Sequence, residues 1–277
     1  FLHLNPTLGC ITSVDADHLD IYGDTASVNA AYSEFASLVK QKIIVAEDVP
    51  IDGIRYSIKN KADYYASSVR AEGFGYRFDL HTPTQNFPSV YFSQLGLHNL
   101  QNALAAFALA SEYGLSEERL AKALASFEGV ERRLQLIYQG DKHILIDDYA
   151  HHPTEINAVW ETLQDAYPKA EKCAVFQPHL FSRTRDFMNE FAWALGRFDR
   201  VLLLPIYPAR ELPIPGISSN VLKEMVASYS KVELCEKDEI AKRLRSVPEK
   251  IKVVLGAGDI GLEVQPIKQK LESNEAK

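Results

Sequence analysis

The densest group of chemically capable side chains lies in residues 147–155, Asp-Asp-Tyr-Ala-His-His-Pro-Thr-Glu. They follow a predicted apolar strand over residues 143–146 and precede a helix with Pro153 in its first turn. Open α/β sheets bind ligands beyond the carboxyl ends of their strands, and helix N-termini favour anions. We therefore expect a ligand site here, rather than an arrangement in which Asp147 and Thr154 only cap the chain and the histidines are exposed.

Residues 176–185, Phe-Gln-Pro-His-Leu-Phe-Ser-Arg-Thr-Arg, follow the next predicted strand. His179 and Arg183 are four positions apart, so they share a helix face only if the helix has begun by His179. An arginine at this place can bind a carboxylate or phosphate through two hydrogen bonds. The alternative is a surface arginine paired with Asp186 or Glu190, and the sequence leaves both interpretations open.

Residues 15–20, Asp-Ala-Asp-His-Leu-Asp, form a third polar group directly after a β-prone run. Carboxylates and an imidazole at this spacing can hold a divalent cation, although such clusters also serve as caps. Considered apart from any family resemblance, the residues favour a metal-dependent hydrolase. Its ion would be held by Asp17, His18, His151 and His152.

Residues 256–261, Gly-Ala-Gly-Asp-Ile-Gly, match the pattern of a dinucleotide-binding turn and follow a predicted strand. A dinucleotide-binding fold also needs a further strand with an acidic residue about 20 positions on. Too few residues follow Gly261 for such a strand. We expect instead a close approach of the backbone to a ligand or a neighbouring loop. No Gly-Lys dipeptide occurs in the sequence, so it contains no Walker A loop.

The two halves of the sequence differ in the elements that must position these groups. In the first half, Gly73, Gly75, Pro83 and Pro88 interrupt β-prone pieces between residues 54 and 92, which predicts antiparallel hairpins. The other elements expected there are strands over 10–14 and 42–46 and helices over 24–40, 99–113 and, capped by Ser116, 117–127.

The second half alternates strand and helix, which predicts a parallel sheet and an overall α/β fold. The strands expected here are short and fully apolar, as in a sheet buried on both faces: residues 143–146, 173–176, 201–204 and 251–255. One helix follows Pro153, and a second should turn Phe187, Phe191 and Leu195 inward. We expect the domain boundary near Arg132.

Composition narrows the class of protein. The 277 residues are 46% hydrophobic and carry a net charge of −7, which excludes disordered and collagen-like chains and argues against a dedicated nucleic-acid binder. Three scattered cysteines without CxxC spacing indicate reduced thiols in a cytoplasmic protein. No run of about 18 apolar residues is present, so we expect no membrane span. The first residue is Phe1 and not Met, which leads us to expect the interior of a longer protein.

Taken together, these motifs resemble the Mur ligase family. The motifs occur in family order over almost the whole chain: residues 12–20, 96–103, 131–133, 147–155, 176–186, 207–216 and 256–261. The resemblance implies that residues 1–132 are the remainder of a central ATP-binding domain with a mixed sheet. Residues 133–277 would be a Rossmann-like C-terminal domain with amino-acid and nucleotide contacts. A UDP-sugar-binding domain and the P-loop are expected to precede Phe1.

The resemblance also implies an ATP-dependent, amide-forming ligase that uses Mg²⁺ and works in peptidoglycan precursor synthesis. The motifs fit best the member that joins L-alanine to the carboxylate of UDP-N-acetylmuramate through an acyl phosphate. The alternative within the family is a related tripeptide-recycling muramate ligase. This chain alone is expected to be inactive, since it lacks the cradle for the γ-phosphate, and no nucleic acid or membrane is expected as a partner.

Residue roles follow from the same resemblance, position by position. It implies that His18 is a Mg²⁺ ligand. The implied ATP contacts are His98, Asn99 and Asn102 at adenine, Arg133 near the γ-phosphate and Asp148 at the ribose. The implied L-alanine pocket is formed by Tyr149, His151, His179 and Arg183, with His152 as a further catalytic or substrate residue. Leu180 departs from the arginine of many family members, which leaves Arg183 with more of the carboxylate binding.

Overall fold

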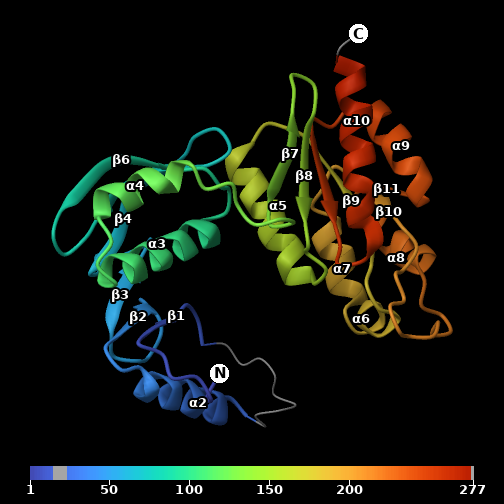
Figure 1. The fold of residues 1–277 in the computed structure, drawn as a ribbon. Coiled ribbons are helices and arrows are strands. Elements are labelled where there is room, and N and C mark those ends of the chain that lie inside the picture. The colour runs from blue at the N-terminus through green and yellow to red at the C-terminus, as the bar shows by residue number, and fades with distance from the viewer. Residues whose placement is uncertain (15–23, 276–277) are drawn as a thin grey trace. The chain divides into compact units, whose positions relative to one another are not determined.

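The structure is a computed structural model that describes residues 1–14 and 24–275. It divides into two compact units, Phe1–Glu128 and Gly129–Lys277, so Arg132 lies at the start of the second unit. Figure 1 shows a mixed α/β architecture in each unit. None of the helices in the described ranges has the length and apolar character needed to cross a membrane.

The first unit, over its described residues, contains a six-stranded sheet with strand order β1-β2-β3-β4-β5-β6. Strands β1 to β4 pair in parallel, and β4, β5 and β6 pair antiparallel. The strands are β1 (Leu8–Ile11), β2 (Lys42–Ala46), β3 (Ile54–Ser57), β4 (Tyr64–Ala71), β5 (Tyr76–His81) and β6 (Asn86–Phe92). The first strand therefore begins and ends earlier than the predicted range 10–14.

The prediction of antiparallel hairpins from residue 54 onward is correct for β4 to β6 and wrong for β3, which is parallel to both of its neighbours. Side-chain hydrogen bonds explain the difference. The Ser57 hydroxyl accepts the N–H groups of Lys59 and Asn60, and an Asp63 oxygen accepts the N–H of Arg55 at 2.8 Å. These bonds turn the chain between β3 and β4, and the glycine and proline pattern does not encode them.

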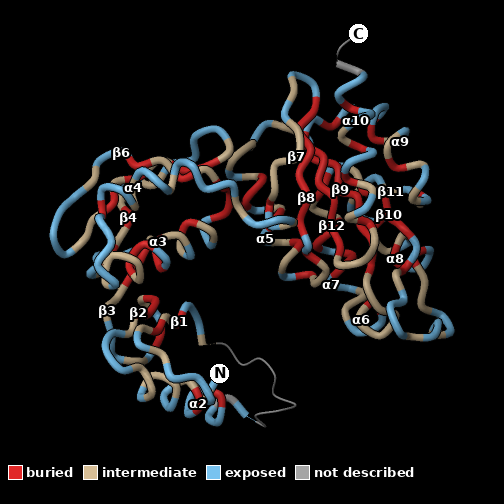
Figure 2. The backbone as a smooth tube through the Cα atoms, viewed as in Figure 1, coloured by how far each residue is buried: buried red, intermediate tan, exposed pale blue. Residues whose placement is uncertain are grey.

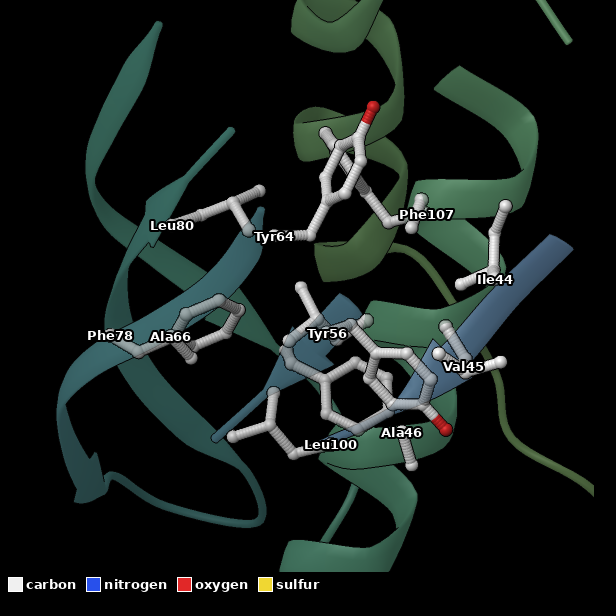
Figure 3. Close-up of a cluster of buried hydrophobic side chains, with 14 of the residues drawn as sticks. Ile44, Val45, Ala46, Tyr56, Tyr64, Ala66, Phe78, Leu80, Leu100 and Phe107 are labelled. Carbon is white, nitrogen blue, oxygen red and sulfur yellow. The ribbon is translucent and has the colours of Figure 1, made fainter. Parts of the chain in front are cut away.

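The helices of the first unit match the predicted ones closely: α2 (Thr25–Leu38), α3 (Leu97–Glu112) and α4 (Glu117–Ala125). Ser116 caps α4 as expected, because its side chain accepts the N–H of Arg119. The core lies between α3 and the sheet, where Leu100 and Phe107 meet side chains from the strands, including the buried rings of Tyr56 and Tyr64 (Figure 3). This packing fixes the start of α3, which carries the predicted adenine contacts.

The second unit contains, over its described residues, a six-stranded sheet with strand order β11-β10-β9-β12-β8-β7. All its pairs are parallel except that of the edge strand β7 with β8. The strands are β7 (Gln135–Gln139), β8 (Ile144–Asp148), β9 (Lys172–Phe176), β10 (Arg200–Leu203), β11 (Lys231–Leu234) and β12 (Ile251–Leu255). The central strands are buried along their length, as Figure 2 shows in red, which confirms the predicted parallel sheet.

Two strands of this sheet, β7 and β11, were not predicted. Both lie at its edges and are only partly buried or exposed, so they lack the apolar run that marks the central strands. The central strands are also not fully apolar, because Lys172 and Lys252 are buried within them. Lys172 Nζ donates to Gln164 Oε1 and to the Ala170 carbonyl, both at 2.8 Å, which satisfies the buried ammonium group.

Helices follow most strands of this unit. They are α5 (Pro153–Ala166), α6 (Phe181–Asp186), α7 (Met188–Leu195), α8 (Ser219–Val226), α9 (Ile240–Ser246) and α10 (Val264–Glu275), with short 3₁₀ turns η1 (Lys237–Glu239) and η2 (Asp259–Glu263). The predicted helix after β9 is in fact two helices, α6 and α7, separated at Phe187. Phe191 and Leu195 are buried as predicted, whereas the Phe187 ring packs against His152 with ring centroids 4.6 Å apart.

Candidate functional site

The carboxyl ends of β8, β12 and β9 lie side by side, because these three strands are neighbours in the second sheet. Hydrogen bonds tie together the segments that follow them. Gln177 Nε2 donates to Asp259 Oδ1 at 2.8 Å, and Gln177 Oε1 accepts the N–H of Ile260 at 3.1 Å. The Gly256 N–H donates to the Asp148 carbonyl. Residues 147–155, 176–185 and 256–261 therefore form one rim of the sheet.

Four of the predicted site residues meet on this rim, and we call Tyr149, His151, His179 and Arg183 the histidine cluster. The His151 ring centroid is 5.4 Å from that of Tyr149 and 6.0 Å from that of His179. Arg183 Nη1 lies 3.4 Å from His179 Nδ1. Two segments that are about thirty positions apart in the sequence thus contribute to one contiguous group, as the strand-end rule predicts.

Helix spacing does not bring His179 and Arg183 together, because α6 begins only at Phe181. Leu180 makes the turn between them with a positive φ of 76°, a conformation that is strained for leucine. Its carbonyl accepts the N–H and the hydroxyl of the buried Thr184 at 3.1 and 2.8 Å. Asp186, one of the two partners in the alternative interpretation of Arg183, pairs with Arg185 at 2.7 Å.

The hydrogen-bonding roles of two ring nitrogens follow from their partners. His151 Nδ1 is 3.0 Å from the Tyr149 carbonyl and 3.4 Å from Glu155 Oε2, both acceptors, so this nitrogen is a donor. His179 Nδ1 faces the Arg183 donor and is therefore the acceptor nitrogen of its ring. Burial, followed by the charge of Arg183 and by His151, lowers the pKa of His179, so this imidazole is neutral near pH 7.

His152, the fifth residue of this predicted group, caps helix α5. Its side chain accepts the Thr154 N–H at 3.4 Å, while Glu155 Oε2 accepts the N–H groups of His151 and His152 at 2.8 and 3.0 Å. This is a capping box with histidine in place of serine or threonine. The structure gives His152 a role in starting α5 and in packing on Phe187.

The two aspartates at the end of β8 have different environments. Asp148 is buried, and its oxygens accept the N–H groups of Leu134 and Ala150 at 2.8 and 2.7 Å. Asp147 forms an ion pair with Arg132, with Nε 3.3 Å from Oδ2. Burial raises the pKa of Asp147 to about 6 in spite of this cation, and burial also raises the pKa of Asp148.

Arg132 is the residue of this rim that the sequence analysis did not select. Within the motif at residues 131–133, the family resemblance implies a role for Arg133 and none for Arg132. Arg132 Cζ lies 4.9 Å from the centre of the Tyr149 ring, and Arg133 Cζ lies 5.9 Å from it. The available signal was Asp147 at the end of an apolar strand, since a buried aspartate requires a partner.

A hollow of about 450 Å³ opens beside the cluster and is lined by Arg132, Tyr207, Ala257, Gly258, Asp259, Gly261 and Leu262. The Tyr207 ring stacks on His179 with centroids 5.5 Å apart. It also lies against Gly258, where an added Cβ would come 2.8 Å from Tyr207 Cγ. The glycine-rich segment therefore serves close backbone approach to a neighbouring loop, which the sequence predicted in place of a dinucleotide site.

The predicted adenine contacts belong to the first unit, whereas the histidine cluster belongs to the second. His98, Asn99 and Asn102 occupy the first turns of α3, where residues three and four apart are neighbours. Asn99 Nδ2 donates to the Leu95 carbonyl at 2.7 Å, which orients its amide oxygen. His98 and Asn102 are exposed, and the His98 ring lies over Gly96, where a Cβ would be 2.6 Å from its Cε1.

The predicted metal ligand His18, together with Asp17 of the hydrolase hypothesis, lies outside the described residues. Within residues 1–14 and 24–275, no three His, Cys, Asp or Glu side chains converge in a way that could hold a metal ion. The metal predictions for residues 15–20 therefore stay predictions.

Comparisons with known proteins match both units. A model of the Mur ligase middle domain matches residues 2–110, and a model described as "Mur ligase, glutamate ligase domain" matches residues 132–260.

Two relatives are named UDP-N-acetylmuramate–L-alanine ligase. The protein from Flavobacterium psychrophilum is 48% identical over 98% of this chain, and the one from Flavobacterium johnsoniae is 45% identical over 99%. A crystal structure of UDP-N-acetylmuramate-alanine ligase from Thermotoga maritima has a similar fold, with a TM-score of 0.80 and 23% identity over 98% of this chain. The chain spans 61% of the length of each of these three proteins.

Proposed function

This chain belongs to the Mur ligase family, and from that premise we propose that it forms the middle and C-terminal parts of an ATP-dependent UDP-N-acetylmuramate–L-alanine ligase. The observation that carries the proposal is the histidine cluster, where Arg183 contacts His179 and His179 lies beside His151 at the carboxyl ends of β8 and β9. An amino acid needs a cation for its carboxylate and a proton acceptor for its amine, and the cluster offers both. The identity of 45–48% to relatives of that name supports L-alanine as the amino acid.

The proposed reaction has two steps that balance. The carboxylate of UDP-N-acetylmuramate attacks the γ-phosphate of ATP, which gives an acyl phosphate and ADP. The amine of L-alanine then attacks the acyl carbon, phosphate leaves, and an amide forms. Phosphoryl transfer needs little covalent help, so the side chains of this chain mainly position the reactants and neutralise charge.

Arg183 is the proposed partner of the L-alanine carboxylate, since a guanidinium binds a carboxylate through two charge-assisted hydrogen bonds. The amine must lose a proton to attack. Because His151 Nδ1 contacts the Tyr149 carbonyl, we assign proton acceptance to the other ring nitrogen, Nε2. His179, whose acceptor nitrogen faces Arg183, presents an N–H on the other side of its ring and serves as a donor.

We also propose residues for ATP binding. Asn99 and Asn102 offer amide groups that match both the donor and the acceptor on the adenine edge, and His98 lies beside them. Asp148 oxygens each accept one backbone N–H and retain a second lone pair for a ribose hydroxyl. Arg133 is the proposed γ-phosphate contact. Mg²⁺, with His18 as a ligand, would neutralise phosphate charge.

The test uses the full-length protein that contains this chain. Phosphate release should require ATP, UDP-N-acetylmuramate and L-alanine together. Arg183→Met should raise the KM for L-alanine by about 10- to 100-fold, the value of a charge-assisted hydrogen bond, with a smaller effect on the KM for ATP. Arg185→Met is the matched control, because Arg185 is exposed and pairs with Asp186. Phosphate release that does not depend on an amino acid would contradict the proposal.

The second candidate is the tripeptide-recycling ligase of the same family. The two differ in the substrate that supplies the amine, so turnover with a tripeptide in place of L-alanine, at a lower KM, would favour recycling. The hydrolase hypothesis predicts hydrolysis that does not require ATP, and omission of ATP tests this prediction. We propose a cytoplasmic location for the protein, because its substrates include ATP.

A further inference from the structure

Arg132 lies among the first residues of the second unit and contacts two of the segments that form the rim. Its Nε is 3.3 Å from Asp147 Oδ2, at the end of β8, and its guanidinium donates to the Gly256 carbonyl, after β12. Gly256 is 124 positions away along the chain. One side chain therefore joins the start of the unit to the ends of two neighbouring strands.

The same residue contacts Tyr149 twice. The Arg132 carbonyl accepts the Tyr149 N–H at 2.8 Å, and the guanidinium carbon is 4.9 Å from the centre of the Tyr149 ring. A cation at this distance from an aromatic face is attracted to it. Both the backbone and the ring of Tyr149 thus contact one residue, and the ring lies nearly perpendicular to that of His151.

Close packing fixes the guanidinium in this place. A Cβ on Gly261 would lie 2.9 Å from Arg132 Cζ, so the glycine is what admits the side chain. The Arg132 backbone has a φ of 58°, and its N–H donates to Gln135 Oε1 at 3.0 Å, which holds the turn. The side chain of Asp147 is only 4% exposed, so its charge acts on Arg132 with little screening by water.

We infer that Arg132, held by Asp147, is a positioning residue that fixes the Tyr149 ring against His151 and thereby sets the affinity of the histidine cluster for its amino acid. The amino acid in this inference rests on the proposed function, whereas the effect on Tyr149 does not. We assign Arg132 an action through Tyr149, because its guanidinium contacts Asp147, Gly256 and the Tyr149 ring.

The first experiment reads the Tyr149 ring directly in the full-length protein, without any substrate. The protein is labelled with 3-fluorotyrosine, and Tyr149→Phe assigns the ¹⁹F signal. Arg132→Met should shift the Tyr149 signal and leave most other tyrosine signals in place. Because Arg132→Met leaves Asp147 buried without its cation, the double variant Arg132→Met/Asp147→Asn removes that charge and keeps the fold testable.

The second experiment measures turnover in the full-length protein. In the double variant the KM for L-alanine should rise about tenfold, with kcat changed much less. Loss of a cation–π contact of this kind changes a binding constant by up to about tenfold. Arg132→Lys keeps a charge for Asp147 and should recover part of the affinity. The matched control is Arg197→Met, since Arg197 also stacks on an aromatic ring, 3.9 Å from Trp160, and pairs with Glu161 at the opposite end of the strands.

The outcomes separate the two hypotheses. If the ¹⁹F signal of Tyr149 does not move in either variant, Arg132 does not position the ring and the inference is wrong. If the signal moves and the KM for L-alanine does not, the link to affinity is wrong. If the wild-type protein does not use L-alanine at all, the proposed function fails, and the ¹⁹F result still decides the positioning role.

Discussion

Arg183 Nη1 lies 3.4 Å from His179 Nδ1, so a permanent cation faces one nitrogen of an imidazole. Protonation of that ring would place two like charges together. Burial contributes most to the lowered pKa of His179, and Arg183 and His151 lower it further. The pair therefore supplies one fixed positive charge and one neutral ring, which is the combination that binding a carboxylate beside a reacting amine requires.

The first prediction concerns this titration. The His179 pKa should lie below the ordinary value of about 6.5, and Arg183→Met should raise it part of the way, because burial remains. Between the two pKa values the unfolded chain binds more protons than the folded one, so stability should rise with pH in that window. Imidazole ¹⁵N chemical shifts followed against pH measure both values. Arg185→Met should leave the His179 titration unchanged, and a His179 pKa that ignores Arg183→Met would contradict the pairing.

The second prediction tests the close approach at Gly258. A Cβ there would meet Gln177 Oε1 and would lie 2.8 Å from Tyr207 Cγ. Gly258→Ala should therefore push Gln177 away from Ile260 and Tyr207 away from His179. We expect a loss of about 1–3 kcal/mol in the free energy of unfolding, measured with urea, as for other overpacked sites.

Gly114→Ala is the control for this change. Gly114 has a φ of 103° and nothing within 4 Å of an added Cβ, so alanine there costs backbone strain without any clash. Both variants should lose stability, but only Gly258→Ala should also disturb the His179 titration. An undisturbed titration in Gly258→Ala would show that Tyr207 is not coupled to the glycine.

Much of the second unit could be predicted because its signals are local. Apolar runs mark β8, β9 and β12, and the rule that ligands bind beyond strand ends then brings Tyr149 and His179 to one edge. In the first unit, the helix cap at Ser116 could be predicted for the same reason, since a cap depends only on the residues of its own turn.

The features that escaped prediction depend on partners far away in the chain. β3 has the residues of a hairpin strand but is parallel to β4, and the Ser57 and Asp63 side chains accept backbone N–H groups at the turn between the two strands. The role of Arg132 depends on Gly256, 124 positions away, and on a buried carboxylate. Phe187, at the break between α6 and α7, packs against the distant His152 ring. None of these partners can be read from the residues adjacent in the sequence.

The third prediction concerns the buried carboxylate of Glu117 in the first unit. Its oxygens accept hydrogen bonds from Thr84 Oγ1 at 2.7 Å and from Ser111 Oγ at 2.8 Å, and also from Thr82 and Gln85. Burial by itself raises the pKa of Glu117, but these bonds outweigh it, and the pKa lies below its ordinary value of 4.5. Glu117→Gln should cost about 1–3 kcal/mol of unfolding free energy at pH 7, because the amide cannot accept all four bonds.

The sign of its pH dependence follows. A carboxyl with a lowered folded pKa stabilises the fold above the unfolded value of 4.5, and this contribution is lost as the pH falls through the folded value. The difference between wild type and Glu117→Gln, measured by urea unfolding, should therefore shrink below pH 4.5. Glu34→Gln, at an exposed position in α2, should change stability little at any pH. A constant difference down to pH 3 would contradict the ionised cluster.

The last prediction concerns Leu180, whose φ of 76° costs a non-glycine residue about 1–3 kcal/mol. Glycine adopts this conformation without strain, although its freer unfolded chain costs about 0.5–1 kcal/mol. Leu180→Gly should therefore be more stable than Leu180→Ala, both variants having lost the same leucine side chain. At Glu190, an exposed position in α7, the order should be reversed, with alanine the more stable.

Function should move in the opposite direction at Leu180. The turn holds His179 and Arg183 at their 3.4 Å contact, and it is fixed by the Leu180 N–H, which donates to the Tyr207 carbonyl at 2.9 Å. Glycine gives this turn more freedom, so the KM for L-alanine in the full-length protein should rise in Leu180→Gly and much less in Leu180→Ala. If glycine is the less stable variant, the positive φ is not strained in the folded protein. If both variants bind the amino acid equally well, the strained turn does not position Arg183.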